Sequence, residues 1–529
     1  MSRGDNVAMT GAISTGSRRI VTRFPCAAGK LASALLPYMA GFAAAAALLC
    51  LAAAGYSGYD DRHDIEAADG WLAHIPFVGT THWHMRHPLV LAIAASFAAF
   101  GRNETSLMLP TIAAYLGVVA LTAALVRSVS DRFTAGLAAL LAASVPLFVI
   151  YAKTPYPDDM ELALALLSLL LFWHGAGRRS APLLLLAGSA AGISWLLRAT
   201  CAPLLIFYAG LFLLGWRVRR ADCVWLLLGF VPFPLCEWAF LYATVGDPFY
   251  RLAIDSRSLE IPSEQMTGWV AGGLHPPFNM ALMAKWKAHG IHAHWAVDPY
   301  IDFVTNPIYG PIFWTGALGA VAACRQPARA GVFARLVCVL AALWIFCVTW
   351  VLNLSPQPRY FGPAVWAAAV MTAFWLRPLF ASKPRVAAAV LAAILAVDVL
   401  AISLRQPPLR AERALADCAA GSAEPMWTNL SQGVFLLEEI GVAGRVHFSE
   451  SASVPPGGLY VTTGDAARRQ GIAGWSEVPC GALRSRHWPG LAAMAPELWA
   501  RMIPSPGTGV LVLRAPGRTG SGAGPVPSP

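Results

Sequence analysis

Long apolar runs recur along the chain and constrain its fold more than any other feature. Many are near twenty residues long and lie between charged or Pro/Gly-rich breaks, so each can cross about 30 Å of hydrocarbon. Backbone groups in lipid must hydrogen-bond within their own segment, so such runs form helices. With 57% hydrophobic and only 13% charged residues among 529, the composition excludes an ordinary soluble globule. We predict an all-α polytopic membrane protein.

Eleven membrane spans are predicted from the positions of these runs. Their approximate bounds are residues 33–56, 106–126, 133–151, 160–174, 182–197, 200–215, 223–243, 308–323, 335–352, 360–376 and 386–403. Arg198 marks either a turn between two spans or a kink within one. The shorter run 87–101 reaches only about 20 Å as a helix, so we predict an interfacial or re-entrant helix there.

Positive charge is distributed unevenly between the two sides of these spans. Eighteen Lys and Arg residues lie in connections on the N-terminal side, against ten in the longer connections that face them. This bias predicts a cytoplasmic N-terminus, and an odd number of spans then places the C-terminal region outside. The same pattern accounts for the net charge of +10, so no nucleic-acid partner is expected. The first span is too long for the apolar core of a cleaved signal peptide.

Beyond the last span the composition becomes polar. Residues 405–515 contain the β-like runs "GRVHFSE", "GGLYVTTG" and "GVLVLRA", which alternate with helical pieces such as "SQGVFLLEEIGV". We predict a transmembrane domain over 1–404, a small extracytoplasmic α/β domain over 405–515 and a disordered tail over 516–529. Cys418 and Cys480 lie in this polar part, where they can pair in a disulfide if the domain faces outside.

Two clusters of acids lie on the predicted outer side. The stretch "SGYDDRHDIEAADGWL" places Asp60 and Asp61 directly after the first span, and "KTPYPDDMEL" places Asp158, Asp159 and Glu161 at the head of another. Partial desolvation at such a junction is expected to raise the pKa of a carboxylate and to make it a stronger base. Each cluster has a plainer alternative, a solvated juxtamembrane helix for the first and N-terminal helix capping for the second.

Basic and aromatic residues are predicted on the same side. The stretches "TTHWHMRHPL" and "NLSPQPRYFGP" contain Arg86, Arg359 and Tyr360. An arginine at membrane depth is costly unless it is paired or lines a polar cavity, and its guanidinium binds phosphate in a bidentate fork. We therefore expect a lipid phosphate held close to a carboxylate, with snorkelling of each arginine as the alternative. The acceptor side of the pocket is expected to contain His82, Trp83, Asp159 and Glu161.

Histidines are concentrated in the two long outer loops, which hold nine of the twelve. The stretch "HGIHAH" within 245–307 has spacing that suits metal ligands. No HExxH motif or acid-rich cage accompanies it. We therefore expect no metal and no other cofactor, and a divalent ion is the less favoured alternative.

The order of these segments resembles the GT-C glycosyltransferases, and in particular the superfamily of protein O-mannosyltransferases and lipid A aminoarabinose transferases. The resemblance covers roughly residues 33–400. It is carried by Asp60-Asp61, "RHPL" (86–89), "FGRNE" (100–104), "YPDDMEL" (156–162) and "RYFGP" (359–363). It implies a multi-pass enzyme of the bacterial inner membrane that takes a sugar from a polyprenyl-phosphate donor. The acceptor would be an envelope lipid, glycan or protein at the periplasmic face.

The resemblance also implies catalytic roles for three acids. Asp60 matches the leading acid of the family, the proposed general base or acceptor-positioning carboxylate. Asp61 stands where the family usually has Glu, and Asp158 matches the second acid. No family resemblance covers the region after residue 405, so the acceptor is not indicated.

Donor-phosphate binding is implied for three further residues. Arg86 stands where the family has a lysine that contacts the phosphate, and Arg359 and Tyr360 match the late "RY". His87 replaces the first proline of the family's doublet, which changes the expected shape of that loop.

We expect inverting transfer from this arrangement. Asp60 takes the proton of an acceptor hydroxyl, which attacks the anomeric carbon from the face opposite the phosphate, while Arg86 and Arg359 stabilise the leaving phosphate. The competing function is a membrane transporter or a flippase of lipid-linked sugars, which would place ionisable groups near the midplane on repeated, broken helices. Charges gathered at one face, with no visible repeat, favour the transferase.

Overall fold

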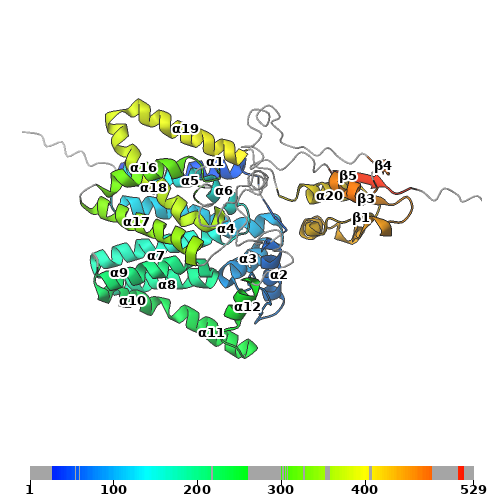
Figure 1. The fold of residues 1–529 in the computed structure, drawn as a ribbon, viewed down its shortest axis with the longest axis horizontal. Coiled ribbons are helices and arrows are strands. Elements are labelled where there is room, and N and C mark those ends of the chain that lie inside the picture. The colour runs from blue at the N-terminus through cyan, green and yellow to red at the C-terminus, as the bar shows by residue number, and fades with distance from the viewer. Residues whose placement is uncertain are drawn as a thin grey trace, which may run out of the picture.

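The computed structural model describes most of the chain. A bundle of helices comes first in the sequence and a small sheet follows it. The described residues are 27–516 without 54, 59, 216–217, 260–299, 301–302, 304–305, 307, 326–327, 352–357, 404–407, 473 and 479–509. Figure 1 shows the helical bundle, coloured blue to yellow, with the sheet lying beyond the end that carries α2 (Asp60–Ala73) and α3 (His87–Phe100). The expectation of a mostly helical chain with a small C-terminal sheet is confirmed.

Six segments of the described chain are helical, long and apolar enough to cross a membrane. They are α4 (Glu104–Arg127), α7 (Asp158–Arg178), the consecutive α10 (Arg220–Phe230) and α11 (Pro232–Val245), α17 (Ala328–Phe346) with the turn Cys347–Val351, the 3-10 turn Pro358–Phe361 with α18 (Gly362–Ser382), and α19 (Pro384–Ser403). A seventh is added if α5 (Arg132–Ser144) and α6 (Pro146–Ala152), bent by 61° at their junction, form one broken span.

Further apolar helices complete the bundle. They are α1 (Ala27–Leu51), with its apolar part at Met39–Leu51, and the shorter α3, α8 (Ala181–Leu197), α9 (Ala202–Leu214) and α16 (Ile312–Cys324). Each of the eleven predicted spans falls on one of these apolar helices or helix pairs, and α3 occupies the range predicted for the short helix. The number of actual crossings stays a prediction, because several of these helices are shorter than a full span.

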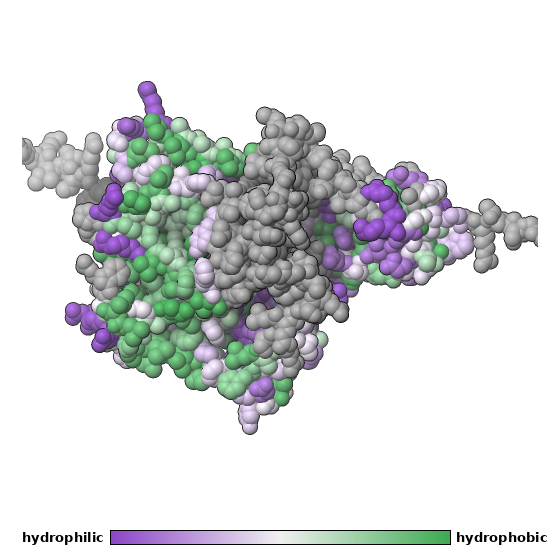
Figure 2. Space-filling view, in the orientation of Figure 1, coloured by the Kyte–Doolittle hydropathy of each residue, from purple (hydrophilic) through white to green (hydrophobic). Residues whose placement is uncertain are grey.

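The outer surface of the bundle suits contact with lipid. Figure 2 shows apolar residues covering much of the flank, with hydrophilic residues at the end of the bundle away from the sheet. Leu213, Leu214 and Leu318 are 70%, 78% and 61% exposed on this kind of surface. An apolar exterior of this extent is unfavourable in water. Together with the apolar helices it marks a multi-pass membrane protein.

Arginines at several helix ends lie at the end of the bundle opposite the first acids of α7. Arg127 ends α4, Arg132 begins α5 and Arg178 ends α7, whereas α7 begins with Asp158. Because consecutive antiparallel helices alternate in direction, these arginines lie at the end of the bundle away from Asp158. The two ends therefore differ in charge.

Local sequence signals fix the helix starts near the acids. The Asn103 side chain accepts the N–H of Ser106 at 2.9 Å, and the Ser106 hydroxyl accepts the N–H of Asn103 at 3.2 Å, which closes a capping box at the start of α4. Pro88 lies in the first turn of α3, where its missing N–H leaves no bond unmade. Inside the bundle, a Cβ on Gly188 or Gly229 would overlap the facing backbone, so α8 and α10 approach closely only because both residues are glycine.

The C-terminal region folds into a five-stranded mixed sheet with the order β2-β1-β3-β5-β4. Its strands are β1 (Met426–Thr428), β2 (Val446–Phe448), β3 (Leu459–Thr463), β4 (Ser476–Glu477) and β5 (Val510–Arg514). β1 pairs in parallel with β2 and β3, and β5 pairs antiparallel with β3 and β4. The helices are α20 (Arg410–Gly421), α21 (Val434–Glu439) and α22 (Gly464–Arg469). The three β-like runs of the sequence form β2, β3 and β5.

The structure describes only one of the two cysteines that were predicted to pair. Cys418 on α20 is disulfide-bonded. Cys480 lies outside the described residues, as does nearly all of the predicted tail over 516–529.

Ion pairs and one aromatic contact hold the sheet domain against the bundle. Arg413 of α20 donates to Glu104 at the start of α4, with one N–H at 3.1 Å. Arg102 lies between Asp69 of α2, at 3.0 Å, and Glu438 of α21, at 2.8 Å. The ring of Tyr56, just before α2, lies 5.0 Å from that of Phe435 on α21. These contacts place the sheet domain beside α2.

Candidate active site

Asp60 forms the centre of a charged cluster at the start of α2. The Arg359 Nη1 donates to Asp60 Oδ2 at 2.8 Å, and Arg86 Nη2 lies 4.0 Å from the same oxygen. Arg86 precedes α3 and Arg359 precedes α18, so the fold joins three segments that are far apart in the sequence. The side chains of all three residues are at most 15% exposed. The structure thus brings together the acid and both arginines that were predicted to share a site.

The pKa of Asp60 differs from the expectation. Burial acts to raise it, but the guanidinium groups of Arg359 and Arg86 outweigh burial and lower the pKa of Asp60 below its usual value. The prediction that desolvation makes Asp60 a stronger base is therefore wrong for this arrangement. Asp60 is instead a firmly ionised carboxylate, because two cations accompany it.

Asp64, one turn further along α2, has the raised pKa instead. Its side chain is fully buried, and Asp64 Oδ2 lies 3.8 Å from Arg86 Nη1. Neither carboxylate oxygen has a hydrogen-bond partner among the described residues. Burial raises the pKa of Asp64 well above its usual value, and the attraction of Arg86 only partly offsets this. The helical spacing from Asp60 to Asp64 was the signal in the sequence that could have identified it.

Asp61 has a structural role at the same helix end. It accepts hydrogen bonds from the Ser57 N–H and, at 2.9 Å, from the Ser57 hydroxyl. The Ser57 hydroxyl also lies 3.1 Å from the hydroxyl of Tyr156. Asp61 thereby fixes the loop that enters α2, and a catalytic role for it stays a prediction.

Asp158, at the start of α7, pairs with Arg198, which the sequence analysis interpreted as a turn or kink and did not assign to the site. Arg198 Nη1 donates to Asp158 Oδ1 at 2.8 Å, and the Arg198 guanidinium carbon lies 4.5 Å from the centroid of the Tyr360 ring. The Arg359 guanidinium carbon lies 5.4 Å from the same ring, so Tyr360 contacts both cations. The signal was present in the sequence, because Arg198 interrupts two apolar runs and so is costly unless paired.

Asp159 and Glu161 are buried in the first turns of α7, where acids favour the positive end of the helix dipole. Glu161 accepts a hydrogen bond from the Thr200 hydroxyl at 2.7 Å. Asp159 Oδ2 has no hydrogen-bond partner among the described residues. Both are near the cluster in sequence but contact no arginine through a hydrogen bond, so their predicted role with the acceptor stays a prediction.

His82 and Trp83 form an aromatic stack beside the arginines. The ring centroids of His82 and Trp83 lie 3.8 Å apart, and those of His63 and Trp83 lie 4.6 Å apart. Burial, followed by the positive charge of Arg86, lowers the pKa of His82 to about 3. His82 is therefore a neutral imidazole that adds no charge to the cluster, and the predicted contact of His82 and Trp83 with the acceptor stays a prediction.

A second histidine group lies further along α2. His63 Nδ1 is 3.1 Å and His84 Nε2 is 3.7 Å from Glu66 Oε2, a grouping that could hold a metal ion. However, His84 Nδ1 accepts the N–H of Thr80 at 3.2 Å, which places the proton of a neutral ring on the Nε2 that faces Glu66. A protonated nitrogen is not a metal ligand, so this arrangement fits a hydrogen-bonded cluster better. The "HGIHAH" stretch lies outside the described residues.

The cluster has unused capacity to bind an anion. Arg86 Nη1 and Arg359 Nε are buried without a hydrogen-bond partner among the described residues. Each is a charged donor for which a missing partner costs free energy. The predicted contact of these two arginines with a donor phosphate stays a prediction. The site therefore combines acids with partly unoccupied guanidinium groups at one end of the bundle.

Comparison with known proteins identifies the class of this fold. Residues 86–238 match the family of dolichyl-phosphate-mannose-protein mannosyltransferases, a stretch that contains Arg86, Asp158 and Arg198 but neither Asp60 nor Arg359. No curated protein sequence matches the chain. The resemblance to the GT-C superfamily that the sequence predicted is confirmed at the level of the fold.

Solved structures give particular neighbours within this class. ArnT from Cupriavidus metallidurans in the apo state aligns with a TM-score of 0.50 and 14% identity, over 86% of this chain and 96% of ArnT. The Archaeoglobus fulgidus oligosaccharyltransferase, in its complex with Zn and sulfate, aligns with a TM-score of 0.45 and 14% identity, over 77% of this chain. The alignment spans 62% of the archaeal protein, so this chain matches less than two thirds of it.

Proposed function

We propose that this protein is a membrane glycosyltransferase that moves a sugar from a polyprenyl-phosphate donor to an acceptor hydroxyl. The observation that carries the proposal is the convergence of Arg86, Arg198 and Arg359 on buried acids at one end of an apolar bundle. Such a cluster suits a phosphate that arrives on a lipid, because the charged group meets the arginines while its tail stays among apolar helices. The match to the mannosyltransferase family over residues 86–238 supports this reading.

The donor phosphate is assigned to Arg86 and Arg359. Their unpartnered N–H groups point to a bidentate anion, and Tyr360 holds Arg359 against Arg198 through its ring. These cations stabilise the negative charge that builds on the phosphate as the glycosidic bond breaks. A phosphate monoester leaving group held by guanidinium groups does not require a divalent ion, so we propose that no metal or other cofactor takes part.

Donor binding would also prepare Asp60. In the unliganded site Arg359 and Arg86 lower the pKa of Asp60. When a phosphate engages both arginines, their charge is shared, and the pKa of Asp60 rises toward that of a useful base. Asp60 then takes the proton of the acceptor hydroxyl while the oxygen of that hydroxyl bonds to the anomeric carbon. The bond to the phosphate oxygen breaks on the opposite face, so configuration inverts and polyprenyl phosphate leaves.

We place the site at the periplasmic face of a bacterial inner membrane. The helix-end arginines Arg127, Arg132 and Arg178 lie at the end of the bundle away from Asp60, a position typical of basic residues on the cytoplasmic side of membrane proteins. The disulfide-bonded Cys418 agrees, since such bonds persist in oxidising compartments. An envelope lipid, glycan or protein is the proposed acceptor.

A transfer assay tests the proposal. Membranes containing the protein receive polyprenyl phosphate carrying a radiolabelled sugar, and label is then measured in envelope lipid, glycan and protein fractions. Asp60→Asn and Arg86→Ala should each reduce transfer by about 100- to 1000-fold, the usual effect of removing one group that stabilises the transition state. Arg62→Gln, which removes an exposed charge on the same helix, is the matched control and should leave transfer unchanged.

Two outcomes would contradict the proposal. Full transfer by both Asp60→Asn and Arg86→Ala would show that the reaction occurs elsewhere. If the unmodified protein carries the labelled lipid across a vesicle membrane and glycosylates nothing, the chain is a flippase or transporter.

A further inference from the structure

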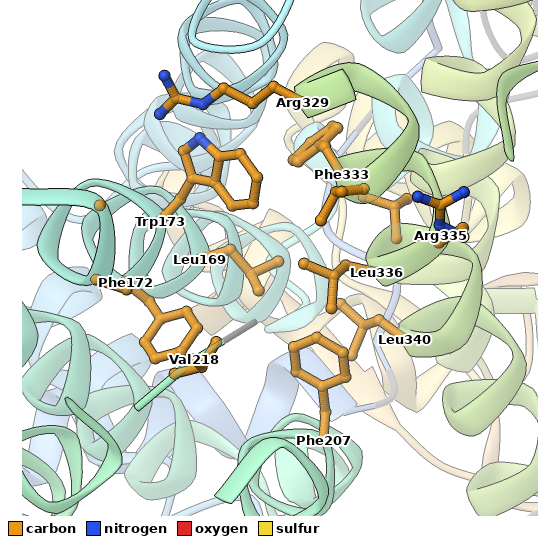
Figure 3. Close-up of a pocket in the computed structure, with 14 residues that line it drawn as sticks. Leu169, Phe172, Trp173, Phe207, Val218, Arg329, Phe333, Arg335, Leu336 and Leu340 are labelled. Atoms are coloured by element: carbon orange, nitrogen blue, oxygen red, sulfur yellow. The ribbon is translucent and has the colours of Figure 1, made fainter. Parts of the chain in front are cut away.

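A cavity lies in the part of the bundle that the proposed reaction does not use. It has a volume of about 620 Å³ and lies between α7, α9 and α17, as Figure 3 shows. This volume is within the usual range for sites that bind small ligands. Its apolar lining includes Leu169, Phe172, Phe207, Phe333, Leu336 and Leu340.

The cavity is remote from the Asp60 cluster. Its residues on α7 run from Leu169 to Gly177, whereas Asp158 of the cluster begins that helix. A helix rises 1.5 Å per residue, so the cavity lies about 16 to 28 Å further along α7. That position is near Arg178, at the basic end of the bundle.

Two arginines give the rim of the cavity a positive charge. Figure 3 shows Arg329 and Arg335 at its rim, with the guanidinium of Arg329 over Trp173. The Arg329 guanidinium carbon lies 5.4 Å from the centroid of the Trp173 ring, and Arg335 Nη1 donates to the carbonyl of Cys324 at 2.9 Å. Neither arginine pairs with a carboxylate within the described part of the chain. The Trp173 Nε1 likewise has no hydrogen-bond partner there.

These features define the chemistry of a ligand. Apolar walls suit a hydrocarbon chain, because such a chain carries no polar group that would lack a hydrogen-bond partner there. Two guanidinium groups and an indole N–H on the rim are all donors, so the head of the ligand must be an acceptor with negative charge. Basic pockets between membrane helices bind anionic lipid head groups in this way.

We propose that this cavity is a binding site for an anionic phospholipid of the leaflet at the basic end of the bundle. One acyl chain occupies the space between α7, α9 and α17, and the phosphate contacts Arg329 and Arg335. The polyprenyl donor is a poorer match, because its phosphate is assigned to the opposite end. The site does not depend on the proposed transferase activity, since no residue is shared between the two.

Lipid titration of the purified full chain in detergent tests this proposal. Phosphatidylglycerol and phosphatidylcholine with identical acyl chains are added separately, and bound lipid is counted by native mass spectrometry while thermal unfolding is followed in parallel. The unmodified protein should retain phosphatidylglycerol in preference to phosphatidylcholine. Arg329→Gln/Arg335→Gln should weaken phosphatidylglycerol binding on the order of 10- to 30-fold, from the loss of two basic contacts at a membrane surface.

Matched variants separate binding from folding. Arg385→Gln removes an exposed charge at the start of α19, at the same end of the bundle but outside the cavity, and should keep the preference. Arg329→Gln alone leaves the Arg335 bond to Cys324 intact and should lose part of the preference. Val332→Phe fills the cavity and should reduce binding of both lipids.

The proposal is overturned if the double variant discriminates between the two lipids as well as Arg385→Gln does. It is also overturned if Val332→Phe binds phosphatidylglycerol normally, or if the protein retains polyprenyl phosphate at this cavity in place of phospholipid.

Discussion

Replacing Arg359 should destabilise the folded protein as well as impair sugar transfer, because the Asp60–Arg359 pair is nearly buried. The side chains are 15% and 11% exposed, and the two atoms lie 2.8 Å apart. Removing one partner of a buried ion pair costs about 3–5 kcal/mol, because the remaining charge loses its compensation. Asp60 keeps Arg86 at 4.0 Å, so Arg359→Gln should fall near the lower end of that range.

A double-mutant cycle measures this contribution directly. Unfolding free energies are compared for the unmodified protein, Asp60→Asn, Arg359→Gln and the double variant, all in the same detergent. The double variant should be less destabilised than the sum of the singles, with a coupling of about 1–3 kcal/mol.

The exposed pair Arg62–Glu66 on the same helix provides the control cycle. Its side chains are 57% and 43% exposed, so its coupling should stay below about 1 kcal/mol. If the Asp60 and Arg359 effects simply add, or match those of the surface pair, the two residues do not form the buried pair described above.

Three further predictions follow from individual residues. Arg198→Gln should reduce sugar transfer at least tenfold and Arg198→Lys less so, because Asp158 then loses a charged partner; transfer rates with both variants check this. Burial holds the pKa of Asp64 above its unfolded value, so the folded state binds the extra proton and loses stability as pH rises above about 4. The melting temperature of Asp64→Asn should therefore rise relative to that of the unmodified protein as the pH is raised from 4 to 9. A difference in melting temperature that stays constant with pH would contradict this. Cys418→Ser should lower the stability of the sheet domain by about 2–5 kcal/mol, as measured by its unfolding with and without reductant.

The apolar runs were enough to predict the helices, since hydrocarbon leaves the backbone no other regular structure. They could not give the number of crossings. Whether α8 and α9 each cross depends on packing around Arg198, and whether α5 and α6 form one span depends on a bend of 61°. The strands β2, β3 and β5 lie within the β-like runs of the sequence, whereas β1 and β4, of three and two residues, lie in no such run.

For the site, the sequence could indicate which residue types belong together but not how they pair. Asp60, Arg86 and Arg359 were grouped through their predicted position at one membrane face, and the structure places them in contact. The direction of the pKa shift of Asp60 could not be predicted, because it depends on the distances from Asp60 to two guanidinium groups, and only the fold defines these distances. Arg198 was not assigned to the site because its position between apolar runs indicates only that it needs a partner, and the sequence does not show that this partner is Asp158.

A structure of the protein with polyprenyl phosphate bound tests the central claim most directly. The account predicts phosphate oxygens within hydrogen-bond distance of Arg86 Nη1 and Arg359 Nε, with the Arg359–Asp60 bond lengthened or broken. A phosphate bound elsewhere, with the Asp60–Arg359 bond still at 2.8 Å, would contradict it.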